Sequence, residues 1–117
     1  MVAEYAVGGG EEAGGSLLRE GKAMLTTLRR GFERLGNDVV YPEAEDDFES
    51  AVDTLSKRSD AGIVIAPDDR LGELTEIVES NTLNLGCPSA CVKICADKMQ
   101  ATKILQDEGV PVPRLVP

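Results

Sequence analysis

The fold of this chain is decided by the stretch Ala61–Ala66, which reads AGIVIA and is followed by Pro67. The stretch has the length of a strand and carries no polar residue. Continuous apolar character is typical of a strand in a parallel sheet whose two faces are both covered. We therefore expect a buried parallel strand here, ended by Pro67.

Short strands and amphipathic helices surround this stretch. Three more segments read as short strands: Val2–Val7, Asp38–Tyr41 and Leu83–Gly86. Apolar residues at helical spacing, with caps and stop signals, predict helices over residues 16–35, 46–57, 71–79, 89–95 and 97–108. This alternation predicts an α/β fold, a three-layer Rossmann-like sandwich around a short parallel sheet.

Polar residues predict where several helices begin. We expect Ser16, Ser89 and Asp97 to be N-caps, and Asp46 with Glu49 to form a pair like a capping box.

Two glycines fall inside the helix predicted over residues 16–35. Gly21 and Gly31 each weaken it by roughly 1 kcal/mol relative to alanine, which suggests close packing or ligand approach at these positions.

Composition excludes several classes of function. The chain has 117 residues and a net charge of −9, which opposes binding to nucleic acid. It has no histidine, so a histidine-based catalytic dyad and a histidine-ligated metal site are both excluded within this chain. No apolar run approaches the roughly 20 residues of a membrane span. Three cysteines and an N-terminus unlike a signal peptide predict a cytoplasmic protein. A homo-oligomer is compatible with these patterns.

Ligands of open parallel sheets bind beyond the carboxyl ends of the strands. The first such connection is the glycine-rich loop 8–15, where Gly8, Gly10 and Ala13 match a loose G-x-G-x-x-A pattern. That pattern would bring backbone N–H groups to a pyrophosphate, but Glu11 and Glu12 stand where the phosphate would lie. A mobile loop facing the substrate and a plain flexible connection are the alternatives.

Two other clusters each allow two interpretations. Asp68 and Asp69 follow the buried strand and suit an amine or a hydrated metal ion, or Asp69 caps the next helix. Cys87, Cys91 and Cys95 are spaced four residues apart. They are small buried hydrophobes, or they hold a metal cluster with a ligand from outside the chain.

The last predicted helix carries the strongest signal. With Asp97 as its N-cap, Lys98 lies in the first turn, where a cation opposes the helix dipole. A lysine there suits a phosphate, which would interact with both the dipole and the ammonium group. The alternative is a solvated lysine.

A family resemblance adds to this interpretation. The run 96–113, with Asp97-Lys98, Ile104-Leu105 and Gly109–Pro113, resembles the opening of ATP-grasp domains, which belong to ligases that join a carboxylate to an amine with ATP. In that superfamily the matching lysine contacts ATP phosphates, a role that the resemblance gives to Lys98. The preceding unit is similar to the pre-ATP-grasp domain. The resemblance thus implies two parts: residues 1–95, a pre-ATP-grasp domain, and residues 96–117, the start of an ATP-grasp domain.

Four further segments narrow the resemblance: Glu4–Ala6, Leu17–Leu25, Ile65–Asp69 and Asn84–Ser89. They are similar to archaeal ligases of this superfamily that join glutamate to tyramine in methanofuran biosynthesis. The resemblance implies that ATP phosphorylates the carboxylate and that the amine attacks the resulting acyl phosphate. It also implies ATP and Mg²⁺ as cofactors, bound mostly by residues after Pro117, and an inactive chain when residues 1–117 stand alone.

Position at strand ends makes four residues candidates for substrate binding: Glu20, Asp68, Asp69 and Ser89. No catalytic residue of this chain is named by the resemblance. A free-standing Rossmann-like nucleotide-binding or regulatory module is one alternative function, and a pure interaction subunit is another.

Overall fold

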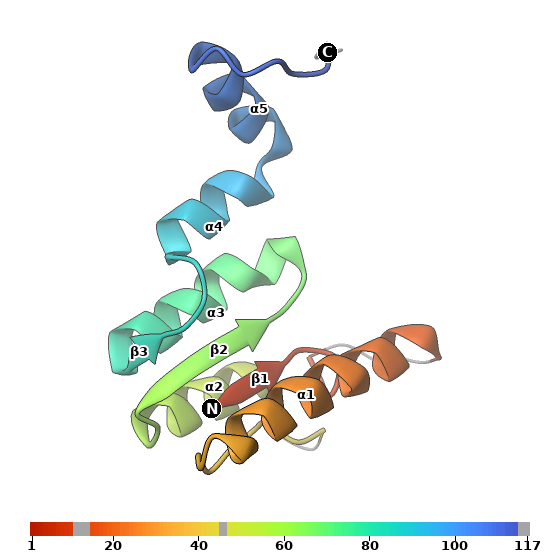
Figure 1. Ribbon diagram of the computed structural model, residues 1–117, viewed down its shortest axis with the longest axis vertical. Coiled ribbons are helices and arrows are strands. Elements are labelled where there is room, and N and C mark those ends of the chain that lie inside the picture. The colour runs from red at the N-terminus through yellow and green to blue at the C-terminus, as the bar shows by residue number, and fades with distance from the viewer. Residues whose placement is uncertain (11–14, 45–46, 115–117) are drawn as a thin grey trace.

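The computed structural model describes residues 1–10, 15–44 and 47–114 (Figure 1). Its elements follow in the order β1 (Val2–Glu4), α1 (Ser16–Arg34), α2 (Phe48–Lys57), β2 (Ala61–Ile65), α3 (Asp68–Asn81), β3 (Leu83–Asn84), α4 (Ser89–Ala96) and α5 (Lys98–Asp107). The strands form a parallel sheet in the order β1-β2-β3. This confirms the predicted α/β, Rossmann-like fold.

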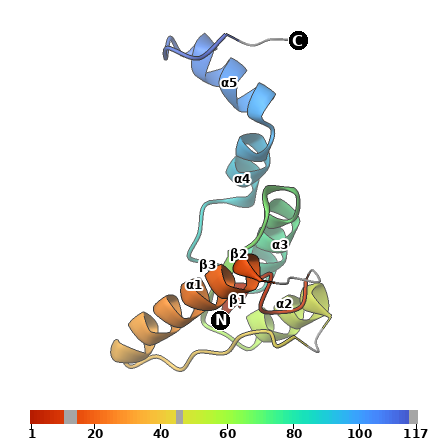
Figure 2. The same ribbon diagram turned by 90° about the vertical axis from the view of Figure 1, so that its right-hand side faces the viewer.

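The apolar stretch that begins at Ala61 forms β2, in the middle of the sheet. Its register pairs Ile63 with Val2 and Ile65 with Glu4 on one side, and Ala61 with Leu83 on the other. Helices lie on both faces: α2 and α3 pack together behind β2, and α1 lies in front against β1 (Figures 1 and 2). The core lies between the sheet and the α2–α3 layer, and it contains Met1, Ala3, Phe48, Val52, Leu74 and Val78.

One predicted strand is wrong. Residues 38–41 form no strand, and the backbone hydrogen bond that links them to β1 is a single one, from Val2 N to Val40 O at 3.0 Å, within the described part of the chain. A strand needs a repeated ladder, and Pro42 has no N–H group to extend it. β1 is also shorter than predicted, because hydrogen-bonded turns begin at Tyr5.

The predicted caps are mostly displaced by one residue. Asp97 is the N-cap of α5, as expected. The N-caps of α1 and α4 are Gly15 and Pro88, so the predictions of Ser16 and Ser89 are wrong. The N-cap of α2 is Asp47, whose side chain accepts from Ser50 N at 3.3 Å. The predicted cap Asp46 lies outside the described residues.

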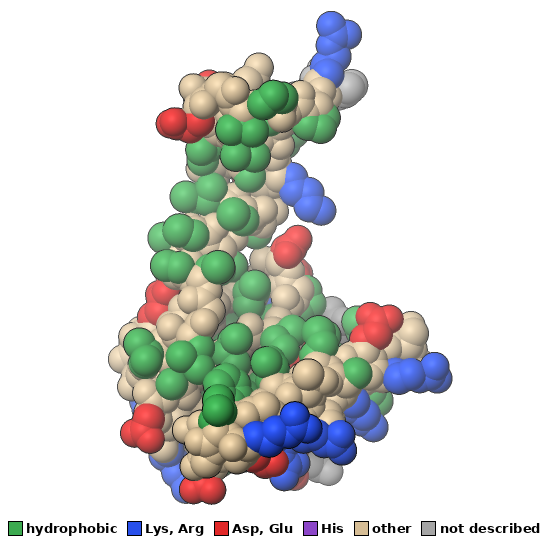
Figure 3. Space-filling view, viewed as in Figure 1, with side chains coloured by type: hydrophobic (Ala, Val, Ile, Leu, Met, Phe, Trp, Pro, Cys, Tyr) green, Lys and Arg blue, Asp and Glu red, His purple; other side chains and the backbone are tan. Residues whose placement is uncertain are grey.

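The C-terminal helices form an arm that leaves the sheet (Figure 2). Helix α4 packs on α3, whereas α5 packs on α4 and has no buried residue. The Cα radius of gyration is 16.0 Å, against about 13 Å for a compact domain of this length. Figure 3 shows hydrophobic side chains along this arm, and the exposed ones include Ile94, Met99, Ile104, Leu105 and Val110.

Candidate functional site

The carboxyl edge of the sheet is where a parallel α/β fold places ligands, and here it is built by the turns that follow β1. Gly8 N donates to Glu4 O and Gly10 N donates to Tyr5 O, both at 2.9 Å, so the chain coils back over the strand end. The starts of α1 and α3 lie on the same side of the molecule (Figure 1). Helix N-termini and strand ends therefore converge at this edge.

The described part of the glycine-rich loop is packed. The rings of Tyr5 and Phe48 meet edge to face with centroids 5.1 Å apart. A side chain at Gly8 would place its Cβ 2.5 Å from Phe48 Cε2, and one at Gly10 would lie 2.6 Å from Tyr5 Cζ. Two aromatic rings therefore account for the absence of a side chain at these two positions. The remaining part of the predicted pattern, Glu11, Glu12 and Ala13, lies outside the described residues.

Arg70 lies at this edge and was missed by sequence reasoning. Its guanidinium bridges Glu49 of α2 and Glu73 of α3, each at 3.2 Å. The hydrogen bond that Arg70 donates to Glu49 is the main cause that raises the pKa of Arg70; desolvation opposes it, and electrostatic interactions with Tyr5 and Glu73 add to it. Its charge is already shared by two carboxylates, so its role at this edge is to hold the starts of α2 and α3 together.

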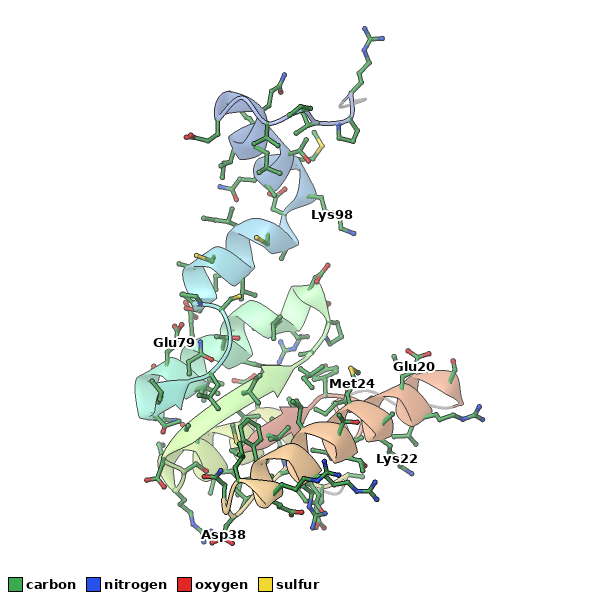
Figure 4. All side chains as sticks on the ribbon, viewed as in Figure 1. Glu20, Lys22, Met24, Asp38, Glu79 and Lys98 are labelled. Atoms are coloured by element: carbon green, nitrogen blue, oxygen red, sulfur yellow. The ribbon has the colours of Figure 1, made fainter. Side chains whose placement is uncertain are left out.

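Three of the four candidate substrate-binding residues are exposed carboxylates. Asp68 and Asp69 form the first turn of α3, and the N-cap is Pro67, with no side-chain cap bond. The interpretation of Asp69 as a cap is therefore wrong, although both acids favour the helix dipole. Glu20 lies on α1, well apart from Lys98 in Figure 4. The structure thus brings Asp68 and Asp69 together but keeps Glu20 away from Lys98.

The fourth candidate, Ser89, is buried in a contact between helices. Glu79 of α3 accepts from Ser89 N at 2.8 Å and from Ser89 Oγ at 2.5 Å, and Asn84 donates to the same carboxylate at 3.4 Å. The hydroxyl of Ser89, followed by its N–H, lowers the pKa of Glu79. Both polar groups of Ser89 are thus used to hold α4 on α3.

A second polar contact fixes the same pair of helices. Lys93 of α4 pairs with Glu76 of α3. The lysine stem crosses Gly72, where a Cβ would lie 2.6 Å from Lys93 Cγ. The absence of a side chain at position 72 therefore lets α4 lie close to α3. Two polar clamps, Glu79–Ser89 and Glu76–Lys93, set where the arm leaves the sheet.

The three cysteines are free and exposed, so their interpretation as small buried hydrophobes is wrong. No group of three or more histidine, cysteine or acidic residues suited to a metal ion occurs in residues 1–10, 15–44 and 47–114. In the same ranges, no helix has both the length and the apolar character that crossing a membrane requires.

Lys98 begins α5 and is exposed. In Figure 4 its side chain points away from the arm, on the side of the molecule where β2 leads into α3. Asp97 Oδ1 accepts from Met99 N at 3.1 Å and from Gln100 N at 3.0 Å. Those two N–H groups are therefore already used, and a phosphate at this helix start would meet the ammonium of Lys98 rather than a free helix terminus.

A buried carboxylate completes this edge. Glu4, the last residue of β1, is 5% exposed, and its side chain lies against Gly21 of α1. Its Oε2 accepts from Val7 N at 2.8 Å. The signal in the sequence was the single acid within the apolar run Val2–Val7, together with a glycine inside α1. The close packing expected at Gly21 is confirmed, whereas a Cβ at Gly31 would meet nothing within 4 Å.

Two hollows of the described surface lie elsewhere, beside α2. One of about 470 Å³ lies beside α2 and is lined by Tyr41, Glu43, Asp47, Ser50, Ala51, Thr54 and Leu55. It contains none of the residues proposed from the sequence. We therefore take the strand ends, not this hollow, as the candidate site, because general rules for parallel sheets place ligands there.

Comparison with known proteins yields one curated relative. The chain is 30% identical, over 89% of its length, to tyramine–L-glutamate ligase of Methanocaldococcus fervens, and it spans 44% of that protein. No protein-family model matches the chain, and no solved structure matches it. The distant homology confirms, at the family level, the resemblance drawn from the sequence.

Proposed function

Starting from distant homology at the level of the ATP-grasp family, we propose that this chain is the substrate-side part of an ATP-dependent carboxylate–amine ligase. The observation that carries the proposal is the 30% identity over 89% of the chain to a ligase. The parallel sheet supports it, because its carboxyl edge offers a floor on which a small substrate would lie.

The proposed reaction has two steps. The carboxylate oxygen attacks the γ-phosphorus of ATP and ADP leaves, which gives an acyl phosphate. The amine nitrogen then attacks the acyl carbon, inorganic phosphate leaves, and the nitrogen loses a proton. In the first step the ammonium of Lys98 would contact phosphate oxygens, in a charge-assisted bond.

Mg²⁺ in such enzymes neutralises phosphoryl charge and orients the transferring group. The described residues do not fit this ion, because they contain no group of three acidic side chains that converge. We therefore assign no step of the metal chemistry to this part of the protein.

The proposal also assigns a separate role to each of two parts of the chain. We propose that residues 1–95 form the substrate floor and that residues 96–117 open the ATP-binding part. Two features support this division: α5 packs on α4 and has no buried residue, and Lys98 lies at its first position. The clamps of α4 on α3 would then fix the distance between the floor and Lys98.

The substrate pair is proposed from the relative. We expect glutamate as the carboxylate and tyramine as the amine, because the name of the relative states that pair. The test is ATP-dependent amide formation by the native gene product that carries this chain. Glutamate, aspartate and a panel of amines would be supplied, and products and released phosphate measured.

Formation of γ-glutamyl-tyramine with stoichiometric phosphate would support the proposal in full. An amide from another pair would keep the ligase and replace the substrates. Saturable nucleotide binding without any amide product, even with both substrates present, would instead favour a free-standing nucleotide-binding module.

A further inference from the structure

Glu4 is a buried carboxylate, and its contacts within the fold account for only one of its two oxygens. Its Oε2 accepts the N–H of Val7, three residues later, and so caps the turn that follows β1. Oε1 takes no hydrogen bond, and Glu4 forms no ion pair within the described residues. The turn would be equally well capped by a neutral amide oxygen, so it does not require a charged group.

The second oxygen remains open. No fully buried side-chain oxygen or nitrogen among the described residues lacks a hydrogen-bond partner. Oε1 has no hydrogen-bond partner among the described residues, so it must still reach solvent. The residue as a whole is only 5% exposed. Gly21 makes this arrangement possible, because a Cβ there would lie 2.7 Å from Glu4 Cδ.

Burial of a carboxylate without a cation is costly, and buried charges are normally paired. Glu4 has one N–H donor and no cationic nitrogen within 4 Å in the described structure. It nevertheless lies at the carboxyl end of a parallel strand, where ligands of such sheets bind. We propose that Glu4 Oε1 binds the primary ammonium group of a substrate. This inference rests on the proposed function, which supplies two such groups.

Either of two substrates can supply the ammonium group. One source is the α-ammonium of an amino-acid substrate such as glutamate, and the other is the ammonium of the amine substrate. A charge-assisted bond in a shielded site is stronger than one in water. The other candidates for this role, Glu20, Asp68 and Asp69, are exposed, and exposed ion pairs contribute little. Glu4 is therefore the carboxylate at this edge best suited to hold a cation.

The test measures ligand binding by the 117-residue chain in the absence of ATP. Binding is monitored through changes in the NMR chemical shifts of backbone amides. The probes are glutamate and tyramine, with N-acetylglutamate and tyrosol as partners that lack the ammonium. We expect saturable shifts at Val7 and Gly21 with at least one amine probe and none with its partner that lacks the ammonium. Which amine probe is effective identifies the source of the ammonium.

Glu4→Gln keeps an oxygen for Val7 N–H and removes the charge, so it should weaken binding by about tenfold or more. Asp38→Asn is the matched control, because it removes one exposed charge at a residue with no hydrogen bond or ion pair in the described structure, and it should bind as the unmodified chain does. Equal binding by Glu4→Gln would overturn the inference, and so would the finding that each amine probe binds no better than its partner without the ammonium. If Glu4→Gln does not fold, the unmodified chain decides, since shifts confined to residues away from Val7 and Gly21 would also overturn it.

These results are separable from the proposed function. Ammonium binding at Glu4 in a gene product that forms no amide would leave the inference standing and the ligase assignment refuted. Amide formation that is unchanged by Glu4→Gln, with no ammonium-dependent shift, would refute the inference and leave the ligase intact.

Discussion

Glu79 on α3 and Ser89 on α4 are joined by two hydrogen bonds, at 2.8 Å from the Ser89 N–H and at 2.5 Å from its hydroxyl. Through this pair one carboxylate holds the first residue of the next helix. The pair therefore ties the C-terminal arm to the α3 side of the sheet. Its loss should destabilise α4 before it destabilises the core.

Ser89→Ala should loosen α4. The substitution removes the hydroxyl bond to Glu79 and leaves the backbone bond, so local opening of α4 should become more frequent. Hydrogen exchange should show faster exchange in α4 with unchanged protection in α2. Ser80→Ala is the control, because Ser80 Oγ bonds only to Glu76 O of its own helix in the described structure. Equal effects of the two substitutions would contradict a role for the Glu79–Ser89 pair.

The same pair predicts a pH dependence of α4. The pKa of Glu79 is lowered from its ordinary value of 4.5, chiefly by the Ser89 hydroxyl. A carboxylate with a lowered pKa stabilises the fold fully above pH 4.5, and the contribution is lost as the pH falls through the lower folded-state value. After correction for intrinsic exchange rates, amide hydrogen exchange in α4 should therefore increase below pH 4.5 by more than it does in α2. Ser89→Ala should flatten this difference; an identical pH profile in the variant would refute it.

Gly72→Ala should destabilise the chain although alanine is the better helix former. The new methyl group would lie 2.6 Å from Lys93 Cγ, and overpacking of this kind costs about 1–3 kcal/mol. Gly31→Ala is the matched control, since nothing lies within 4 Å of its Cβ, and it should stabilise by about 0.5–1 kcal/mol. Urea unfolding measures both. Lys93→Ala should relieve the cost of Gly72→Ala in the double variant, and strict additivity would contradict the contact.

Lys98→Ala should weaken the use of ATP by the native gene product. Loss of one charge-assisted contact to phosphate should lower kcat/KM for ATP by roughly ten- to a hundredfold. Lys103→Ala removes a charge from the same exposed helix and should leave kcat/KM nearly unchanged. Steady-state kinetics with ATP as the varied substrate provide the measurement, and similar values for the two variants would remove Lys98 from the proposed ATP site.

The sequence predicted those parts of the fold that depend on local pattern. The apolar stretch 61–65 is a strand, the helices follow the apolar spacing, and Asp97 caps α5. The strand predicted at residues 38–41 was wrong because a strand also needs a partner along its length. Within the described residues, β1 offers this segment one backbone hydrogen bond. The prediction that the cysteines are buried was wrong because α4 leaves the sheet instead of packing over it. No local sequence pattern indicates that path.

The candidate site was less accessible to sequence reasoning. Asp68 and Asp69 were proposed because they follow a strand, and that proposal stays a prediction. Arg70 and Glu79 act through partners on other elements, Glu49 and Ser89. Such contacts depend on how helices pack, and residues far apart in sequence carry no shared spacing. Glycines within helices were a partial signal. Gly21 and Gly72 mark positions where another side chain crosses the helix, whereas Gly31 does not.

The C-terminal arm should be the part of the chain most sensitive to proteases. Helix α5 has ten residues, none of them buried, and an isolated helix of this length is marginal in water. It should therefore unfold locally far more often than the sheet, and limited digestion with trypsin should cut after Lys98 or Lys103 well before it cuts within the sheet. A resistant product that ends near residue 98 would show that the sheet and its clamped α4 remain folded after the last helix is gone.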